Sequence, residues 1–220
     1  VAVYGSTEAE PIAHVALDQM DADDRAATAS GNGLLAGVPE RCVALRIVAE
    51  RPGEPAGSYS AAEFDATTQP AGVPGEIVVH GGHVLPGYVG GVGDQETKIR
   101  VDGTIWHRTG DSGRLDERGR LWLLGRTSAR IVDDRGTLYP FAVEAAARQV
   151  PGVARAALIG WKGRRLLLVE PDPARAPDPE AVRAALGGVV LDEVRTIARI
   201  PMDRRHNAKV DYPELEKMLG

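Results

Sequence analysis

A lysine near the end of the chain has the clearest potential for chemistry. Lys209 follows Asn207, a polar residue that tolerates tight turns, and the small Ala208, so its loop can approach a ligand closely. Lysine carries a compact cation on a long stem, which suits it to reach a developing negative charge. A lysine in such a place is more often a solvated surface charge, so the residues upstream have to decide between the two interpretations.

The start of the chain offers groups that can hold a phosphate and a metal ion. In Tyr4-Gly5-Ser6-Thr7-Glu8 the glycine lets the backbone turn sharply, and two hydroxyls with nearby N–H groups can bind a phosphate. Glu8 supplies one hard oxygen, and Mg²⁺ typically takes only one or two protein carboxylates beside phosphate and water. Tyr4 can stack on a purine. The structural alternative is a Ser/Thr cap with an acidic residue in the first turn of a helix.

Two further polar residues follow in the middle of the chain. Asp111, in Thr109-Gly-Asp111, can accept hydrogen bonds from vicinal hydroxyls such as those of a ribose. Arg126 lies fifteen residues later and offers a planar fork that can reach the same oxygens. Taken singly, an aspartate that caps a turn and an arginine in a surface ion pair are the simpler interpretations.

In their order, these signatures resemble the second half of the adenylate-forming superfamily, which contains acyl-CoA synthetases, peptide-synthetase adenylation domains and luciferases. The segments that carry the resemblance are Tyr4-Gly-Ser-Thr-Glu8, Gly75-Glu76-Ile77 with Gly87-Tyr88, Thr109-Gly-Asp111, Gly125-Arg126 and the lysine segment ending at Lys209. The glycine-rich second segment is mainly structural. The resemblance implies that adenine, phosphate and ribose are bound by Tyr4, Gly5, Thr7, Asp111 and Arg126, Mg²⁺ by Glu8, and the reacting carboxylate and phosphate by Lys209.

The implied reaction is the attack of a carboxylate on the α-phosphorus of ATP, with release of pyrophosphate. Two anions must meet, so positive charge aimed at the meeting point should dominate catalysis. By resemblance we expect ATP and Mg²⁺ as cofactors and a fatty or β-hydroxy acid as substrate. The acyl-AMP would then form a CoA thioester, with CoA as a further ligand.

The chain departs from the family pattern in three places. Ser128 stands where the family usually has a hinge Asp or Lys, although a hinge needs only to absorb a change in φ and ψ. The usual Gly-Lys becomes Ala208-Lys209. The run from 131 to 140, with the apolar segment 153–159, is similar to the branch of β-lactone synthetases of olefin biosynthesis, which close a β-hydroxy acyl-AMP to a β-lactone without CoA.

Nothing in these residues corresponds to the family's phosphate loop or to most of its acyl pocket. We therefore expect part of an enzyme whose missing N-terminal portion lies elsewhere, in the same polypeptide or in a partner chain. The alternative is a non-catalytic partner module of a split adenylating enzyme. The joint presence of Glu8, Asp111, Arg126 and Lys209 favours the enzyme.

Composition narrows the class of protein. A net charge of −5 argues against a nucleic-acid binder, and the single Cys42 excludes a disulfide framework or a multi-cysteine zinc site. No transmembrane segment or secretory leader is visible, which predicts a cytoplasmic protein. Three histidines, His80, His83 and His107, lack an accompanying carboxylate cluster, so bonded or exposed histidines are favoured over a metal site. The basic run 162–165 is expected to be a solvated turn, with a CoA phosphate contact as the minority interpretation.

The pattern of apolar residues predicts an α+β protein of two parts. Residues 1–127 are expected to be the back part of a large nucleotide-binding domain, and 128–220 a mobile C-terminal lobe. Within the first part, 1–4 reads as a buried strand, 18–41 as loop with a helical turn at most, 50–72 as irregular, and 72–125 as a small antiparallel β-subdomain. The lobe is predicted to contain helices at 141–150, 179–186 and 213–219 and strands at 153–161, 164–170 and 194–200.

Overall fold

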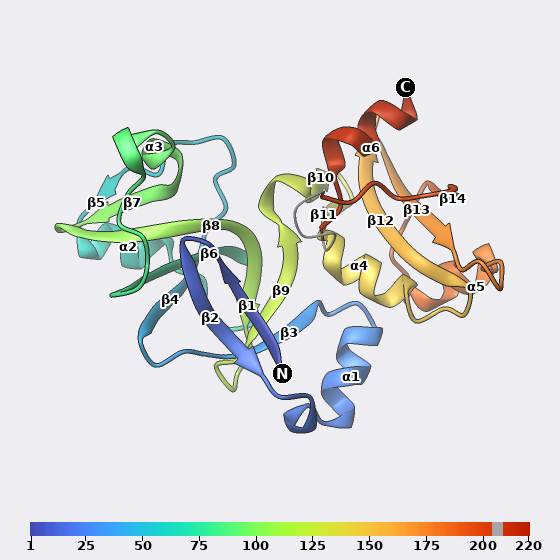
Figure 1. Ribbon diagram of the computed structural model, residues 1–220, viewed down its shortest axis with the longest axis horizontal. Helices are drawn as coiled ribbons and strands as arrows, with labels where there is room; N and C mark the ends of the chain where they lie inside the picture. The colour runs from blue at the N-terminus through green and yellow to red at the C-terminus, as the bar shows by residue number, and fades with distance from the viewer. Residues whose placement is uncertain (204–208) are drawn as a thin grey trace. The chain divides into compact units, whose positions relative to one another are not determined.

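The computed structural model describes residues 1–203 and 209–220, and these form two compact units. The first unit comprises Val1–Asp24 and Leu34–Ser128, and the second comprises Arg25–Gly33 and Ala129–Gly220. Each is α+β, with sheets in which most neighbouring strands run antiparallel, as the sequence predicted (Figure 1). That the first belongs to a larger nucleotide-binding domain and the second is a mobile lobe stays a prediction.

In the described part of the first unit, nine strands form one sheet. The main path runs in the order β1 (Ala2–Ser6), β2 (Ala9–Val15), β3 (Leu34–Pro39), β9 (Leu121–Arg126), β8 (Thr104–Leu115), β6 (Gly75–Gly81) and β4 (Val43–Val48), and β7 (Lys98–Val101) pairs with β8 and with β5 (Ser58–Tyr59). Neighbours on the main path are antiparallel. The long strand β8 pairs with three others, so it is the element through which distant parts of the chain meet.

The remaining elements are short. The helices that begin before residue 129 are α1 (Ala22–Ala29), α2 (Ala61–Thr67) and α3 (Asp94–Thr97), with 3₁₀ turns at Leu17–Gln19, Val89–Gly91 and Thr127–Ala129. Helix α2 begins with a capping box in which the Ser60 hydroxyl accepts from the Glu63 N–H. Its Phe64 packs with Trp106 of β8 and covers one part of the sheet, while Ile12, Ile77 and Leu121 form a second apolar cluster.

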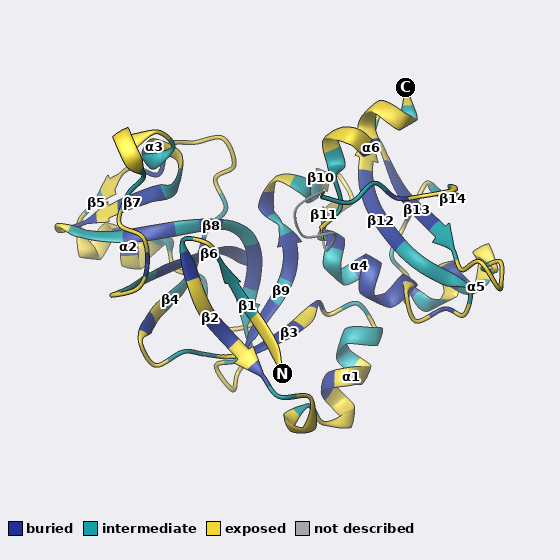
Figure 2. Cartoon of the chain, in the orientation of Figure 1, coloured by how far each residue is buried: buried dark blue, intermediate teal, exposed yellow. Residues whose placement is uncertain are grey.

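The second unit is a three-stranded sheet covered on both faces. Strands β12 (Val153–Trp161) and β13 (Arg164–Pro171) form a hairpin, and β14 (Glu193–Thr196) runs parallel to β13. Alternate residues separate the two faces. Leu158 and Leu167 pack with helices α4 (Pro140–Ala147) and α5 (Pro179–Ala185), while Ala157, Ile159, Leu166 and Leu168 pack with Ile200 and with Leu215 of α6 (Tyr212–Leu219). Figure 2 shows that both hairpin strands are buried along much of their length.

A small hairpin precedes this sheet in the chain. It consists of β10 (Ile131–Asp133) and β11 (Gly136–Leu138). Arg165, which is 3% exposed, donates to Asp133 and to the Gly136 carbonyl, and Arg135 forms ion pairs with Asp133 and Asp192. The expectation of a wholly solvated basic run at 162–165 is therefore wrong for Arg165. Its buried guanidinium forms the hydrogen bonds that connect β13 to this hairpin.

Several local predictions need correction. The strand at the start of the chain is not buried: among the described residues β1 pairs with β2 alone, at one edge of the sheet, and Val1 and Val3 are 78% and 57% exposed. The segment 18–41 contains helix α1 and strand β3, and 50–72 contains β5 and helix α2. Strands β3 and β5 pair with residues far along the chain, which local composition does not report, and helices α1 and α2 are short.

Among the residues described, no helix is both long and apolar enough to cross a membrane.

One buried acid in the second unit predicts a pH-dependent stability. Burial raises the pKa of Glu144 to about 7, against the opposing effect of the Leu158 N–H, the Tyr212 hydroxyl and the charge of Arg148. Because this pKa lies above that of the unfolded chain, the neutral folded acid is favoured at low pH, and stability falls as pH rises from about 4.5 to about 7. Relative to Glu144→Gln, wild type should lose up to ~3 kcal/mol across this window. Urea unfolding at several pH values measures it, and a flat or rising difference would contradict the prediction.

Candidate active site

The first hairpin presents the predicted phosphate and metal residues. Strands β1 and β2 are joined by a tight turn in which Ser6 pairs with Ala9, so Thr7 and Glu8 lie at the tip. The segment is a β-hairpin and not the start of a helix. Gly5 does not make the turn itself: a Cβ there would lie 2.9 Å from the Ala9 carbonyl oxygen, so the glycine permits close approach of the returning strand.

The predicted nucleotide residues Tyr4, Asp111 and Arg126 meet at one carboxylate. The Tyr4 hydroxyl donates to Asp111 Oδ2 at 3.0 Å, and Arg126 Nη1 donates to Asp111 Oδ1 at 2.9 Å. The three residues come from β1, β8 and β9, and Asp111 and Arg126 are direct partners in the ladder. The Asp111 side chain is 15% exposed and that of Arg126 is 43% exposed, so the cluster is accessible from one side. Burial, then the charge of Asp111, raises the pKa of Tyr4 well above its usual value, which keeps the hydroxyl a donor.

The Thr-Gly-Asp segment is shaped by its glycine and threonine. Gly110 has φ +70°, a left-handed conformation that disfavours a side chain. The Thr109 hydroxyl donates to the Ile77 carbonyl at 2.9 Å and accepts from the Asp111 N–H at 3.1 Å. Arg126 Nη1 also donates to the Thr109 carbonyl at 3.2 Å. These bonds hold the Asp111 carboxylate in place before any ligand binds.

Glu8 is held by a tyrosine from a distant loop. The Tyr88 hydroxyl donates to Glu8 Oε1 at 3.0 Å, and the Leu85 N–H donates to the Glu8 carbonyl at 2.7 Å. Burial acts to raise the pKa of the Glu8 carboxyl, but its own N–H, the neighbouring Ser6 hydroxyl and the hydrogen bond from Tyr88 outweigh burial and lower it. The Ser6 hydroxyl oxygen is itself buried and meets no partner in ideal hydrogen-bond geometry within the described residues. The site thus offers a charged carboxylate beside a hydroxyl that still has bonding capacity.

A buried lysine and histidine, which sequence reasoning did not identify as a pair, support the Tyr88 loop. Lys98 is 3% exposed, its Nζ donates to the Leu85 carbonyl at 2.5 Å, and it lies 5.0 Å from the centre of the Tyr88 ring. Nζ also donates to Nδ1 of His107 at 3.2 Å. Burial, then the charge of Lys98, lowers the His107 pKa to about 4, so this histidine is a neutral acceptor. Residues 98–101 alternate charged and apolar side chains, and Lys98 falls in the same phase as the exposed Arg100, so no signal in the sequence indicated that Lys98 is buried.

Lys209 belongs to the second unit. Its side chain is exposed, and its carbonyl accepts from the Asp203 N–H at 2.8 Å. The adjoining Asn207 and Ala208, to which the sequence assigned a tight turn and close approach, lie outside the described residues. Ser128, at the expected hinge position, is exposed in the 3₁₀ turn Thr127–Ala129.

The three histidines make separate contacts. His80 Nδ1 bonds to the Ile105 carbonyl at 2.9 Å, His83 Nε2 to the Pro11 carbonyl at 3.2 Å, and His107 to Lys98. Within the described ranges no group of three or more His, Cys, Asp or Glu residues is placed to hold a metal. A magnesium ion bound mainly by phosphate and water needs no such group, since one carboxylate suffices.

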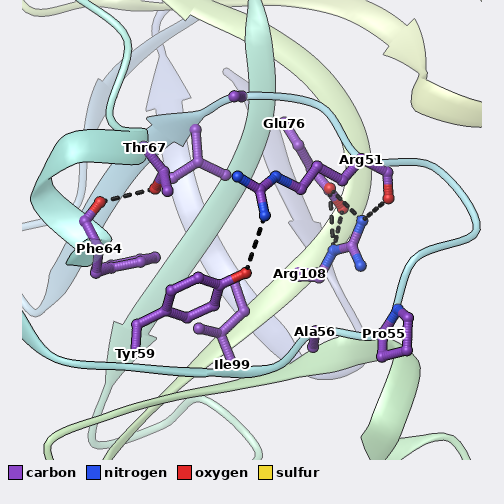
Figure 3. A pocket seen from close by; sticks show the side chains of 11 residues that line it. Arg51, Pro55, Ala56, Tyr59, Phe64, Thr67, Glu76, Ile99 and Arg108 are labelled. Atoms are coloured by element: carbon purple, nitrogen blue, oxygen red, sulfur yellow. Dashed lines mark hydrogen bonds and ion pairs between the residues drawn. The ribbon is translucent and has the colours of Figure 1, made fainter.

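A pocket elsewhere in the first unit contains none of the predicted site residues. It is lined by the apolar Phe64, Tyr59 and Ile99 and by the ion pair between Arg108 and Glu76 (Figure 3). The Arg108 guanidinium donates to both Glu76 oxygens, to the carbonyls of the loop residues Arg51 and Glu54, and to the carbonyl of Glu96 in helix α3. Since these bonds occupy its donors, we assign the arginine a structural role in holding the 51–54 loop.

Comparison with known proteins identifies the class. No family model matches the chain. The chain is 34% identical over 229 residues to an olefin β-lactone synthetase of Stenotrophomonas maltophilia. The aligned region covers 96% of this chain and 40% of the synthetase. Other relatives are acyl- and aryl-CoA ligases. The amide bond synthetase McbA of Marinactinospora thermotolerans matches with a TM-score of 0.74 at 24% identity, over 99% of this chain and 41% of that one. ATP-bound MatB of Rhodopseudomonas palustris matches with a TM-score of 0.65 at 24% identity, and the match covers 84% of this chain and 35% of MatB.

The chain therefore belongs to the adenylate-forming superfamily, and it corresponds to a C-terminal portion of its members. The expectation drawn from its five ordered signatures is confirmed. Its sequence relatives include olefin β-lactone synthetases and acyl- and aryl-CoA ligases. The chain spans about 40% of the length of the first curated relatives that it matches.

The contact between Tyr88 and Glu8 gives a direct test of the site's electrostatics. Removing the hydroxyl in Tyr88→Phe takes away a hydrogen bond to the ionised Glu8 carboxylate, so the Glu8 pKa should rise toward its ordinary value. Carboxyl carbon chemical shifts followed through an acid titration measure this pKa. Tyr59→Phe, which removes a hydroxyl 3.5 Å from Arg51, is the matched control and should leave Glu8 unchanged. An unchanged Glu8 pKa in Tyr88→Phe would contradict the assignment.

Proposed function

We propose that this chain is part of an ATP-dependent enzyme that activates a carboxylic acid as an acyl-AMP. The observation that carries the proposal is that Tyr4 and Arg126, from two different strands, both donate to the partly exposed carboxylate of Asp111 on a third strand. The ligase and synthetase names of the relatives support the same class of reaction.

In this proposal Asp111 binds the ribose of ATP. A carboxylate offers about four lone-pair positions, and Tyr4 and Arg126 use one on each oxygen, so two vicinal hydroxyls can still donate to it. Arg126 reaches the same sugar from the rim of the cluster, and the Tyr4 ring stacks on the adenine. ATP-bound MatB, a neighbour in fold, supports ATP as the nucleotide.

The turn that follows Tyr4 is proposed to hold phosphate and Mg²⁺. The charged Glu8 carboxylate and the buried Ser6 hydroxyl fit a hard cation and a phosphate oxygen, and Thr7 is exposed beside them. The ion, when bound, would neutralise charge on the phosphates. The protein's own part is to hold Glu8 by the Tyr88 hydroxyl so that one carboxylate oxygen stays oriented.

Lys209 is proposed as the catalytic cation. A substrate carboxylate attacks the α-phosphorus, an oxygen–phosphorus bond forms, and the bond to pyrophosphate breaks. An ammonium group near both anions lowers the barrier more than it stabilises the separated reactants. This role needs residues 128–220 to act as a lobe that turns at Ser128, and an N-terminal portion that supplies the acyl pocket.

The first test is ATP–pyrophosphate exchange with a panel of fatty and β-hydroxy acids, using the chain with and without the N-terminal portion. Lys209→Ala should reduce exchange by roughly 10²–10³-fold, by analogy with the loss of one electrostatic stabiliser. Lys217→Ala removes another exposed lysine, which pairs with Glu214 on α6, and should leave exchange unchanged. Equal effects of the two variants would contradict the catalytic role. Exchange by no form of the protein would favour the non-catalytic partner module.

A second test concerns the fate of the acyl-AMP. The olefin β-lactone synthetase relative favours closure of a β-hydroxy acyl-AMP, whereas the CoA ligase relatives favour transfer to CoA. A β-hydroxy acid should be converted with ATP alone if the lactone is formed, because its own hydroxyl displaces AMP. Mass spectrometry of the products with and without CoA distinguishes the two. Formation of the CoA thioester when CoA is added, with no β-lactone in either reaction, would assign the chain to the ligases.

A further inference from the structure

The backbone on either side of Lys209 is tied together. Met202 and Val210 form an isolated antiparallel bridge. The Asp203 N–H donates to the Lys209 carbonyl at 2.8 Å, and the Asp211 N–H donates to the Pro201 carbonyl at 2.9 Å. The position of the Lys209 backbone therefore depends on where these two short stems are held.

Each stem is attached to the second unit by a glutamate from a different element. On the entering side, the fully buried Ile200 donates its N–H to Glu170 Oε2 at 2.7 Å. On the leaving side, the Tyr212 hydroxyl donates to Glu144 Oε1 at 3.0 Å. Glu170 is also paired with Arg155, whereas Glu144 has no ion pair among the described residues.

Glu144 connects a helix on one face of the sheet to a helix on the other face, at the edge of the sheet. It lies on α4, which packs with Leu158 and Leu167, and Tyr212 begins α6, which packs on the other face with Leu166 and Leu168. The same Glu144 oxygen accepts the N–H of Leu158 in the edge strand β12 at 3.0 Å. One buried carboxyl thus connects α4, the sheet edge and the residue three positions after Lys209.

Packing alone does not account for this acid. Glu144 is 7% exposed, and placing an ionisable group there is unfavourable, as its raised pKa indicates. An apolar pair of similar volume would commonly fill such a space equally well. What the polar pair adds is direction, because a hydrogen bond fixes the orientation of the tyrosine while apolar contact does not.

We propose that the Glu144–Tyr212 hydrogen bond is the positioning contact for Lys209, and that Tyr212 is a positioning residue for the proposed adenylation. Removal of this contact lets the stem at Val210–Asp211 shift while the rest of the second unit stays folded. The inference rests on the proposed role of Lys209. Its structural half, that the Glu144–Tyr212 bond holds the stems on either side of Lys209, can be tested without activity; its functional half is the effect of this bond on adenylation.

The structural half is tested by amide hydrogen exchange in the 220-residue chain. The Asp203 and Asp211 amides should exchange at least ~10-fold faster in Tyr212→Phe, relative to the amides of the β12–β13 hairpin in the same molecule. Comparison within one molecule removes any overall loss of stability. Tyr59→Phe is the matched control in the first unit and should leave the ratio unchanged. An unchanged ratio in Tyr212→Phe would overturn the proposal.

The partnership is tested by a double-mutant cycle. Glu144→Leu also removes the bond from the Leu158 N–H, so the Leu158 amide is left out of the reference amides. With this reference, Glu144→Leu should raise the same ratio, and the Glu144→Leu, Tyr212→Phe double variant should show no further increase, since each change removes the Glu144–Tyr212 bond. Additive effects would show that the two residues act separately and would overturn the pairing.

The functional half uses exchange of ATP and pyrophosphate by the assembled enzyme. Tyr212→Phe should lower kcat about 3- to 10-fold with little change in the KM for ATP, and it should have no further effect in a Lys209→Ala background. A loss that persists without Lys209 would overturn the positioning role. If wild type itself gives no exchange, the proposed function fails, and the amide measurements still decide whether the contact holds the Lys209 stems.

Discussion

The arrangement of the candidate site depends on one carboxylate. Asp111 accepts from a tyrosine 107 residues earlier and from an arginine fifteen residues later, so β1, β8 and β9 meet at its two oxygens. Hydrogen bonds to a charged group contribute roughly 1.5–3 kcal/mol each, more than a typical neutral bond. A group held this firmly is oriented before a ligand arrives. Gly110 and Thr109 contribute by fixing the backbone from which the carboxylate projects.

The same arrangement recurs at Glu8, the proposed metal ligand, and in the second unit. Tyr88 holds Glu8, and the buried Lys98 and His107 support the loop that carries Tyr88. Glu144 accepts from Tyr212 at the stem of the Lys209 segment. In all three cases a tyrosine hydroxyl donates to a carboxylate across a long stretch of sequence. This donor suits partly buried acids because it adds no charge and its ring is anchored by packing.

The sequence predicted the second unit better than the first. Strands β12 and β13 contain continuous apolar runs on either side of Lys162-Gly163, and helix α5 has Asp178 as its cap and Pro179 in its first turn, so local patterns determine them. Strands β2, β3 and β7 were not predicted. β3 pairs with β9, far along the chain, whereas β2 and β7 form hairpins with neighbouring strands through tight turns that were not identified as hairpins from the sequence. The site residues were identified only as an ordered set that resembles a family. The contact of Tyr4 with Asp111, the pair Lys98–His107 and the pair Glu144–Tyr212 could not be predicted, since each depends on which strands and helices become neighbours.

The central claim is that Asp111 recognises the ribose of an adenine nucleotide. It is tested most directly by titrating AMP, and its analogue without both ribose hydroxyls, into the assembled protein with ¹³C-labelled tyrosines. Our account predicts that AMP shifts the Tyr4 ring resonances, that the analogue binds roughly tenfold or more weakly, and that Asp111→Asn reduces this discrimination. Equal binding of the two nucleotides by wild type, or a Tyr4 ring that does not respond to AMP, would contradict it.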